Sequence, residues 1–121
     1  MIHYYDIIYY QGVEKMADIY NREIANTIAR RFAELLKKNY SLHSVYLYGS
    51  YAKGNFGEES EIDIAVVADD FTGDIVEDIF KLMKLRRQVD NMIEPHPFSL
   101  KDFNKENPMA KEIIETGIKI M

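Results

Sequence analysis

The segment at residues 45–67, VYLYGSYAKGNFGEESEIDIAVV, combines residue types that can hold a metal ion against phosphate groups. An apolar, strand-like stretch ends in Gly49 and Ser50, and Glu61 and Asp63 follow at the start of a second apolar stretch. Side chains at positions i and i+2 of a strand point the same way, so the two carboxylates converge. They would lie about 6–7 Å apart and would repel each other unless a cation lay between them.

The chemistry that fits this pattern is binding of Mg²⁺ together with a nucleotide's phosphates. Mg²⁺ prefers oxygen ligands, and one or two carboxylates are usually completed by substrate phosphates. Gly49 has no Cβ and lets the backbone approach a phosphate closely. Ser50 is placed to open a short helix that ends at Lys53, a candidate phosphate contact, and N–H groups at a helix start attract anions. The alternative interpretation is a hairpin loop followed by an edge strand with two solvated acids.

The segment resembles the signature of the DNA polymerase β-type nucleotidyltransferase superfamily, which has Gly-Ser, ten residues and then acid-x-acid. In size the chain is similar to the minimal nucleotidyltransferases of bacteria and archaea, which are antitoxin partners of HEPN-domain proteins. The resemblance covers nearly the whole chain, but it departs at Glu61, where the family usually has Asp. It implies an α/β fold with a small mixed β-sheet and helices mainly on one face.

A third carboxylate is expected on a neighbouring strand, because two-metal phosphoryl transfer usually needs one. In the polymerase β pattern a basic pair precedes a hydrophobic-Asp strand, and a proline follows five residues after that Asp. The sequence RRQVDNMIEP fits this pattern, with Asp90 in place of the acid and Pro95 in place of the proline. The resemblance therefore implies Asp90 as the third carboxylate. Glu94 is the alternative, because we expect it to share a strand face with Asp90 and Met92.

The resemblance also implies a reaction, the transfer of AMP from ATP with release of pyrophosphate. Glu61 and Asp63 would hold two Mg²⁺ ions, Asp90 would complete the metal site beside the acceptor, and Gly49 and Ser50 would seat the β- and γ-phosphates. The implied acceptor is a tyrosine hydroxyl of a HEPN-type toxin. Transfer to a small-molecule hydroxyl is a second enzymatic interpretation. The alternative from another class is a binding module that neutralises its partner by contact alone, and Glu61 in place of Asp keeps this alternative open.

Composition constrains the number of domains, the location of the protein and its binding partners. The chain has 121 residues with 47% hydrophobic residues, which predicts one domain spanning residues 1–121. It has no cysteine and no apolar run of about 20 residues, and its N-terminus lacks a basic segment. We expect a soluble, cytoplasmic protein with no membrane segment. The net charge of −5 argues against strong nonspecific binding to nucleic acid.

Hydrophobic periodicity predicts the elements that position the candidate site. We expect helices at 13–39 and 74–87, the second with Ile75 and Leu82 facing inward, and a third helix that Asn107 caps, with Pro108 in its first turn and Gly117 after its last. Strands or extended segments are predicted at 43–48, 61–68, 89–98 and 118–121. The tyrosine-rich residues 1–12 are predicted to form a strand or an arm that packs on the sheet, with contact to a partner or a second copy of the chain as the alternative.

Overall fold

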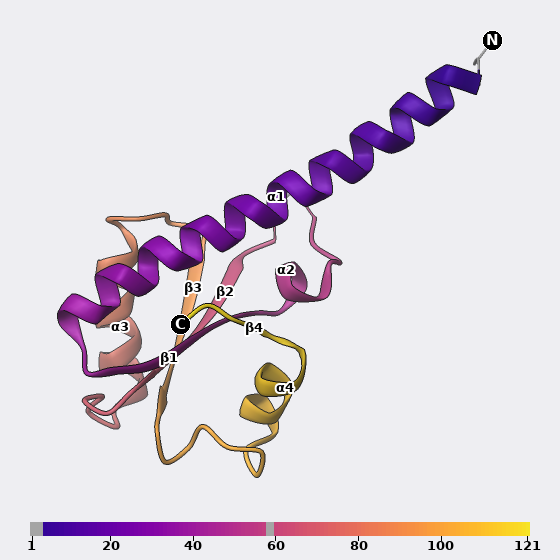
Figure 1. The fold of residues 1–121 in the computed structure, drawn as a ribbon. Helices are drawn as coiled ribbons and strands as arrows, with labels where there is room; N and C mark the ends of the chain where they lie inside the picture. The colour runs from indigo at the N-terminus through magenta and orange to yellow at the C-terminus, as the bar shows by residue number, and fades with distance from the viewer. Residues whose placement is uncertain (1–3, 58–59) are drawn as a thin grey trace.

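The computed structural model describes the backbone of residues 4–57 and 60–121, and the side chains of residues 21–57 and 60–121. Helices and strands alternate along the chain after one long helix (Figure 1). The elements are α1 (Tyr4–Asn39), β1 (Leu42–Tyr48), α2 (Ser50–Lys53), β2 (Ile62–Ala68), α3 (Ile75–Arg86), β3 (Ile93–Ser99), α4 (Pro108–Thr116) and β4 (Ile118–Lys119). The predicted α/β class is therefore confirmed.

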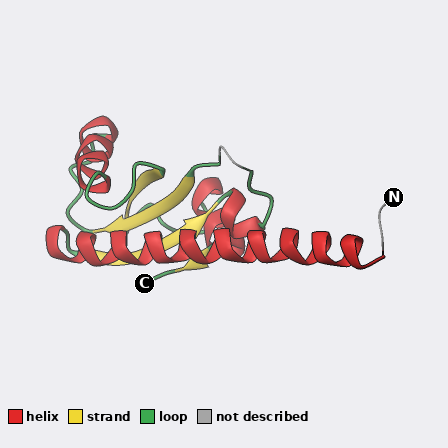
Figure 2. Cartoon of the chain, turned by 90° about the horizontal axis from the view of Figure 1, so that it is seen from above, coloured by secondary structure: helices red, strands yellow, loops and turns green. Residues whose placement is uncertain are grey.

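Helix α1 is longer at its N-terminus than the sequence predicts. It ends at Asn39, as expected, but begins at Tyr4, so the prediction of a strand within residues 1–12 is wrong for residues 4–12. Residues 1–3 lie outside the described part of the chain. No proline interrupts the segment, and Gly12 is its single glycine, so a helix can continue through it. The first turns project past the sheet in both views (Figures 1 and 2).

The four strands form one mixed sheet in the order β3-β2-β1-β4. Strand β1 runs antiparallel to β2 and β4, whereas β2 and β3 are parallel and are joined through α3. Pro95 and Pro97 lie in β3, an edge strand, where a missing backbone donor is tolerated. The order sets β1, β2 and β3 side by side, and these are the strands that carry the candidate site residues.

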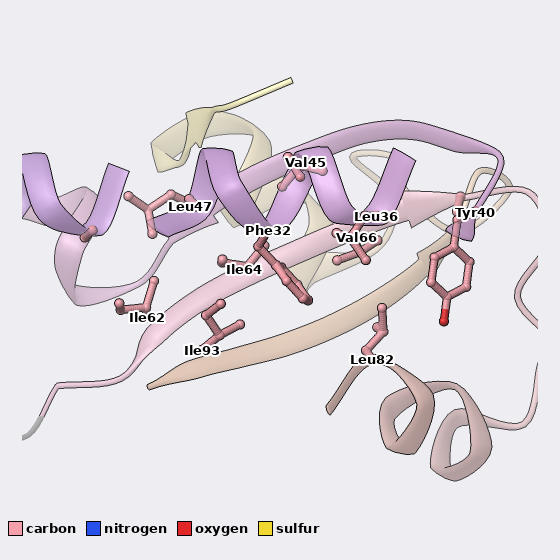
Figure 3. Close-up of a cluster of buried hydrophobic side chains, with 14 residues drawn as sticks. Phe32, Leu36, Tyr40, Val45, Leu47, Ile62, Ile64, Val66, Leu82 and Ile93 are labelled. Carbon is pink, nitrogen blue, oxygen red and sulfur yellow. The ribbon is translucent and has the colours of Figure 1, made fainter. Parts of the chain in front are cut away.

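Helices α1 and α3 cover one face of the sheet and form the main core (Figure 3). Phe32 and Leu36 of α1 pack over Ile64 and Val66 of β2, and Leu82 of α3 joins the same cluster. All five side chains are fully buried. Alternation along β2 therefore commits its even-numbered residues to this face and directs its odd-numbered residues, Asp63 included, to the other.

Helix α4 covers the opposite face, so the helices are not confined to one side of the sheet. Ala110 and Ile113 of α4 form a second buried cluster with Val67 of β2 and Phe98 of β3. The Asn107 side chain caps α4 by accepting hydrogen bonds from the backbone N–H groups of Met109 and Ala110, as the sequence predicts. None of the helices in the described part of the chain is long and apolar enough to cross a membrane.

Candidate active site

Three polar side chains form a row across the sheet on the face that α4 covers. Asp63 of β2 is the register partner of Tyr48 of β1 on one side and of Glu94 of β3 on the other. Register partners in adjacent strands point to the same face, which here also carries Ala65, Val67 and Phe98. Glu61 precedes Asp63 by two residues, is exposed, and lies just before the first residue of β2. The structure thus brings Glu61, Asp63 and Glu94 to one end of one sheet face.

The Gly49-Ser50 turn lies directly against Asp63. Gly49 has a φ of 73°, in the region that favours glycine. A Cβ on Gly49 would collide with the Asp63 carboxylate and would lie 3.2 Å from its Cγ. Any other residue at this position would therefore push the turn and the carboxylate apart. Helix α2 begins at Ser50 and ends at Lys53, as the sequence predicts.

The electrostatics of this row are those of crowded, partly buried acids. Burial raises the pKa of Asp63 to about 6, and the nearby charges of Glu61 and Glu94 add to the effect. The pKa of Tyr48 is raised to about 12 by burial and by the charges of Asp63 and Glu94. A positive charge bound beside Asp63 would offset the repulsion among these carboxylates, which contributes to both raised pKa values.

Asp90 lies apart from the row, in the turn that joins α3 to β3. Because β3 begins at Ile93, Asp90 is not on a strand, and the expectation that it shares a strand face with Glu94 is wrong. Its Oδ1 atom accepts a hydrogen bond from the Met92 N–H at 2.7 Å, which closes the turn. It also lines a groove with α1 residues such as Ile28 and Arg31, on the α1 side of the sheet.

The basic pair that precedes Asp90 also takes part in this turn. The Arg86 Nη1 atom donates a hydrogen bond to the Ile93 carbonyl at 2.7 Å, which ties the end of α3 to the start of β3. The turn therefore uses Arg86 and Asp90 for its own closure.

Lys53 stands at the mouth of a small cavity between α2 and α4. Its Nζ atom pairs with Oε1 of Glu112 at 2.5 Å, and the two side chains are 41% and 61% exposed. The cavity measures about 170 Å³. Its walls come from the end of β1, from α2 and from one face of α4 and comprise Tyr48, Gly49, Lys53, Met109, Glu112, Ile113 and Thr116.

The chemistry of the donors in the row fits Mg²⁺. Among the described side chains no group of three or more His, Cys, Asp or Glu is close enough to form a complete metal cage. Mg²⁺ does not need such a cage, since it is usually bound through one or two carboxylates, with water and phosphate oxygens in its other positions. Asp63, with Glu61 or Glu94, supplies oxygen ligands of this kind.

The sequence did not identify the α4 contribution or the place of Tyr48. The α4 wall consists of Met109, Glu112, Ile113 and Thr116, which follow the spacing i, i+3, i+4, i+7 of one helix face. That spacing was the signal that could have identified them as a unit. Tyr48 could be placed beside Asp63 only with the register of β1 and β2 in hand.

Comparison with known proteins shows which family has this site. The sequence profile of the family described as "Polymerase beta, Nucleotidyltransferase" matches residues 30–121. The chain belongs to the polymerase β nucleotidyltransferase family. The match includes the Gly49-Ser50 turn, both acids of the Glu61-x-Asp63 pair and the strand that carries Glu94.

Four similar proteins of Methanocaldococcus jannaschii are named as candidate protein adenylyltransferases. One is 30% identical over 91 residues, which cover 75% of this chain and 88% of that protein. Another is 46% identical over 43 residues, which cover 36% of this chain and 43% of that protein. The chain aligns with less than half the length of three of these relatives.

Solved structures agree with this family. A toxin-antitoxin crystal structure with AMP-PNP shares 27% identity and a TM-score of 0.56, over 74% of this chain and 68% of that chain. A mutant form of the toxin-antitoxin MntA-HpeT shares 26% identity with a TM-score of 0.52, over 75% of this chain and 70% of that chain. A candidate nucleotidyltransferase from Sulfolobus solfataricus has the same fold, with 17% identity and a TM-score of 0.63 over 84% of each chain.

Proposed function

We propose that this chain is a Mg²⁺-dependent nucleotidyltransferase that transfers AMP from ATP to a hydroxyl group of a partner protein. The observation that carries the proposal is the position of Asp63, which lies against Gly49 and opposite Glu94. This arrangement sets a turn that can admit phosphates, a central carboxylate and a second carboxylate in sequence along one sheet face. It matches the three tasks of the reaction, which are to hold the triphosphate, neutralise its charge and receive the acceptor.

The Gly49-Ser50 turn and the three acids each have a role in the proposal. The Gly49-Ser50 turn would seat the β- and γ-phosphates, and Glu61 and Asp63 would hold two Mg²⁺ ions. Glu94 takes the role that sequence reasoning gave to Asp90, because Glu94 shares a face with Asp63 and Asp90 does not. When bound, Mg²⁺ neutralises the charge on the triphosphate and on the pyrophosphate that leaves.

The reaction follows from this placement. The acceptor hydroxyl oxygen forms a bond to the α-phosphorus as the bond from that phosphorus to the pyrophosphate oxygen breaks, with the two oxygens roughly in line. Glu94 is exposed and lies on the side of Asp63 away from the Gly49 turn, so it can accept the proton of an incoming hydroxyl. Pyrophosphate leaves on the Gly49 side. The protein contributes mainly position and charge.

Lys53 is proposed to contact the triphosphate after it leaves Glu112. The pair is exposed on both sides, and surface ion pairs of this kind contribute about 0–1 kcal/mol. A triphosphate carries several negative charges and can therefore compete for the lysine. The exchange would leave Glu112 free at the mouth of the cavity.

The proposed acceptor is a tyrosine of a HEPN-type toxin encoded beside this gene. Support comes from the relatives named as candidate protein adenylyltransferases and from the neighbours in toxin-antitoxin structures, one of them with AMP-PNP. The alternative is a module of this family that neutralises a partner by contact without transfer. It stays open because Glu61 replaces the usual Asp.

One experiment separates transfer from contact. The protein and the product of the neighbouring gene are incubated with Mg²⁺ and ATP labelled at the α-phosphate, beside an Asp63→Asn variant. The proposal expects label on the neighbour with the native protein and a loss of at least about 100-fold with the variant. If the native protein and the variant neutralise the neighbouring gene's product to the same degree and neither of them labels it, the protein acts by binding alone.

A further inference from the structure

The cavity between α4 and the Gly49 turn has the walls of a site for a flat, uncharged group. Met109 and Ile113 of α4 supply apolar surface, and the Tyr48 ring supplies an aromatic side. The polar groups, Lys53, Glu112 and Thr116, belong to the same lining. Small-molecule sites are typically built in this way, with apolar walls and a few polar groups that orient the ligand.

The size of the cavity limits what it can take. Sites for a whole drug-sized molecule measure about 300–1,000 Å³. The present cavity, at about 170 Å³, suits one ring system of a nucleotide. The apolar surface of Met109 and Ile113 does not suit a phosphate, because burial of an anion there would remove its hydration, so the phosphates are confined to the edge formed by Gly49 and Lys53.

The position of the cavity decides between the nucleobase and an aromatic side chain of the acceptor. The cavity borders Gly49 and Lys53, on the Tyr48 side of Asp63, whereas Glu94 lies on the other side of Asp63. In-line transfer requires the acceptor and the leaving pyrophosphate on opposite sides of the α-phosphorus. With pyrophosphate at the Gly49 turn, the acceptor approaches from β3 and stays away from this cavity. The nucleoside, attached to the same phosphorus, is the group left to occupy it.

We propose that the cavity lined by Tyr48, Met109 and Ile113 receives the nucleobase of the nucleoside triphosphate. The inference rests on the proposed function and adds to it a subsite for which helix α4 supplies most of the wall. It predicts that substitutions on the exposed edge of α4 change nucleotide affinity without changing how the triphosphate is held.

The test compares a ligand that has a base with one that lacks it. Calorimetry measures binding of ATP and of tripolyphosphate, each with Mg²⁺, to the native protein, to Met109→Trp and to Val76→Trp. Met109 is 37% exposed, so the larger ring can be accommodated while it fills the cavity. Val76, 74% exposed on α3, is the matched control. Thr116→Leu narrows the same cavity from the last turn of α4. It is a second, independent variant, so the result does not depend on whether Met109→Trp folds normally.

The expected result is ATP affinity at least about tenfold lower in Met109→Trp and Thr116→Leu, with tripolyphosphate affinity unchanged and Val76→Trp equal to the native protein. Unchanged ATP affinity would overturn the inference, and so would an equal loss for both ligands. If labelling of the partner protein falls in these variants while their ATP affinity is unchanged, the cavity belongs to the acceptor and the inference is wrong. Failure of the native protein to bind either ligand would refute the proposed function itself, and this result differs from all of the others.

Discussion

Glu94 lies directly opposite Asp63 in the parallel register of β2 and β3. Adjacent strands are about 4.8 Å apart, so the two carboxylates face the same side at short range whenever the sheet forms. Burial raises the pKa of Asp63 to about 6, and the charges of Glu61 and then of Glu94 add to the rise. The sheet holds two like charges together at a cost to its own stability, which is typical of sites that bind a cation.

Asp63→Asn should stabilise the protein at pH 7.5. The raised pKa means that the folded state holds the Asp63 proton more tightly than the unfolded state does. The stabilisation of the folded state that comes from this bound proton is therefore present in full below the unfolded pKa of 3.8 and is lost as the pH rises through about 6. Asn does not ionise and avoids this loss, which is about 1 kcal/mol after allowance for solvent screening. Thermal unfolding should show a Tm about 4 °C higher at pH 7.5.

The pH dependence provides the control for this prediction. At pH 3.5 the variant and the native protein should unfold at nearly the same temperature, because Asp63 is then mostly protonated in both states. Glu115→Gln changes an exposed carboxylate of α4 and should leave the Tm nearly unchanged at both pH values. A Tm for Asp63→Asn below that of the native protein at pH 7.5 would contradict the repulsion described above.

Gly49→Ala should disturb the site more than Gly73→Ala does. Both glycines have positive φ, 73° and 91°, so each variant carries backbone strain of about 1–2 kcal/mol. Only Gly49 has a neighbour that a Cβ would strike, the Asp63 carboxylate, whereas nothing lies within 4 Å of the position at Gly73. We expect a similar Tm loss from strain in both variants, with a further loss and weaker Mg²⁺-ATP binding for Gly49→Ala alone. Equal ligand affinities in the two variants would show that the close approach of Gly49 to Asp63 is not needed.

Loss of the α4 cap should weaken nucleotide binding as well as stability. Asn107→Ala removes hydrogen bonds to Met109 and Ala110 N–H, and Asp74→Ala removes hydrogen bonds to Val76 and Glu77 N–H at the start of α3. Each change should cost about 1 kcal/mol of unfolding free energy. Because α4 lines the cavity beside Gly49 and α3 does not, ATP affinity should fall only for Asn107→Ala. The two variants are compared at the same folded fraction. Equal ATP affinities would show that α4 does not contribute to the nucleotide site.

The local part of the site was predictable from sequence because it depends on short-range geometry. Glu61 and Asp63 share a face through the two-residue period of a strand, and Gly49-Ser50 follows an apolar strand directly. The α/β class and the capped helix after Asn107 rest on similarly local signals.

The third carboxylate needed the structure. Residues 90, 92 and 94 have the same parity, so alternation alone could not separate Asp90 from Glu94. The start of β3 at Ile93 separates them, because the turn uses Asp90 for its own hydrogen bond.

Long-range packing was also beyond the sequence patterns. Leu82 and Ile75 fall on one helical stripe, yet Leu82 is fully buried and Ile75 is 49% exposed. Periodicity defines the stripe, but tertiary packing sets how much of it the sheet covers. The pairing of Lys53 with Glu112 joins residues far apart in the sequence and likewise follows from the placement of α4.

Labelling of the partner protein by the Glu94→Gln and Asp90→Asn variants shows which acid completes the site. Transfer of α-labelled AMP to the partner protein is measured at equal protein concentration and below the Tm of both variants. We predict that Glu94→Gln loses at least about 100-fold in rate, whereas Asp90→Asn stays within about twofold of the native protein. A large loss with Asp90→Asn together with native transfer by Glu94→Gln would contradict the assignment of Glu94 as the third acid.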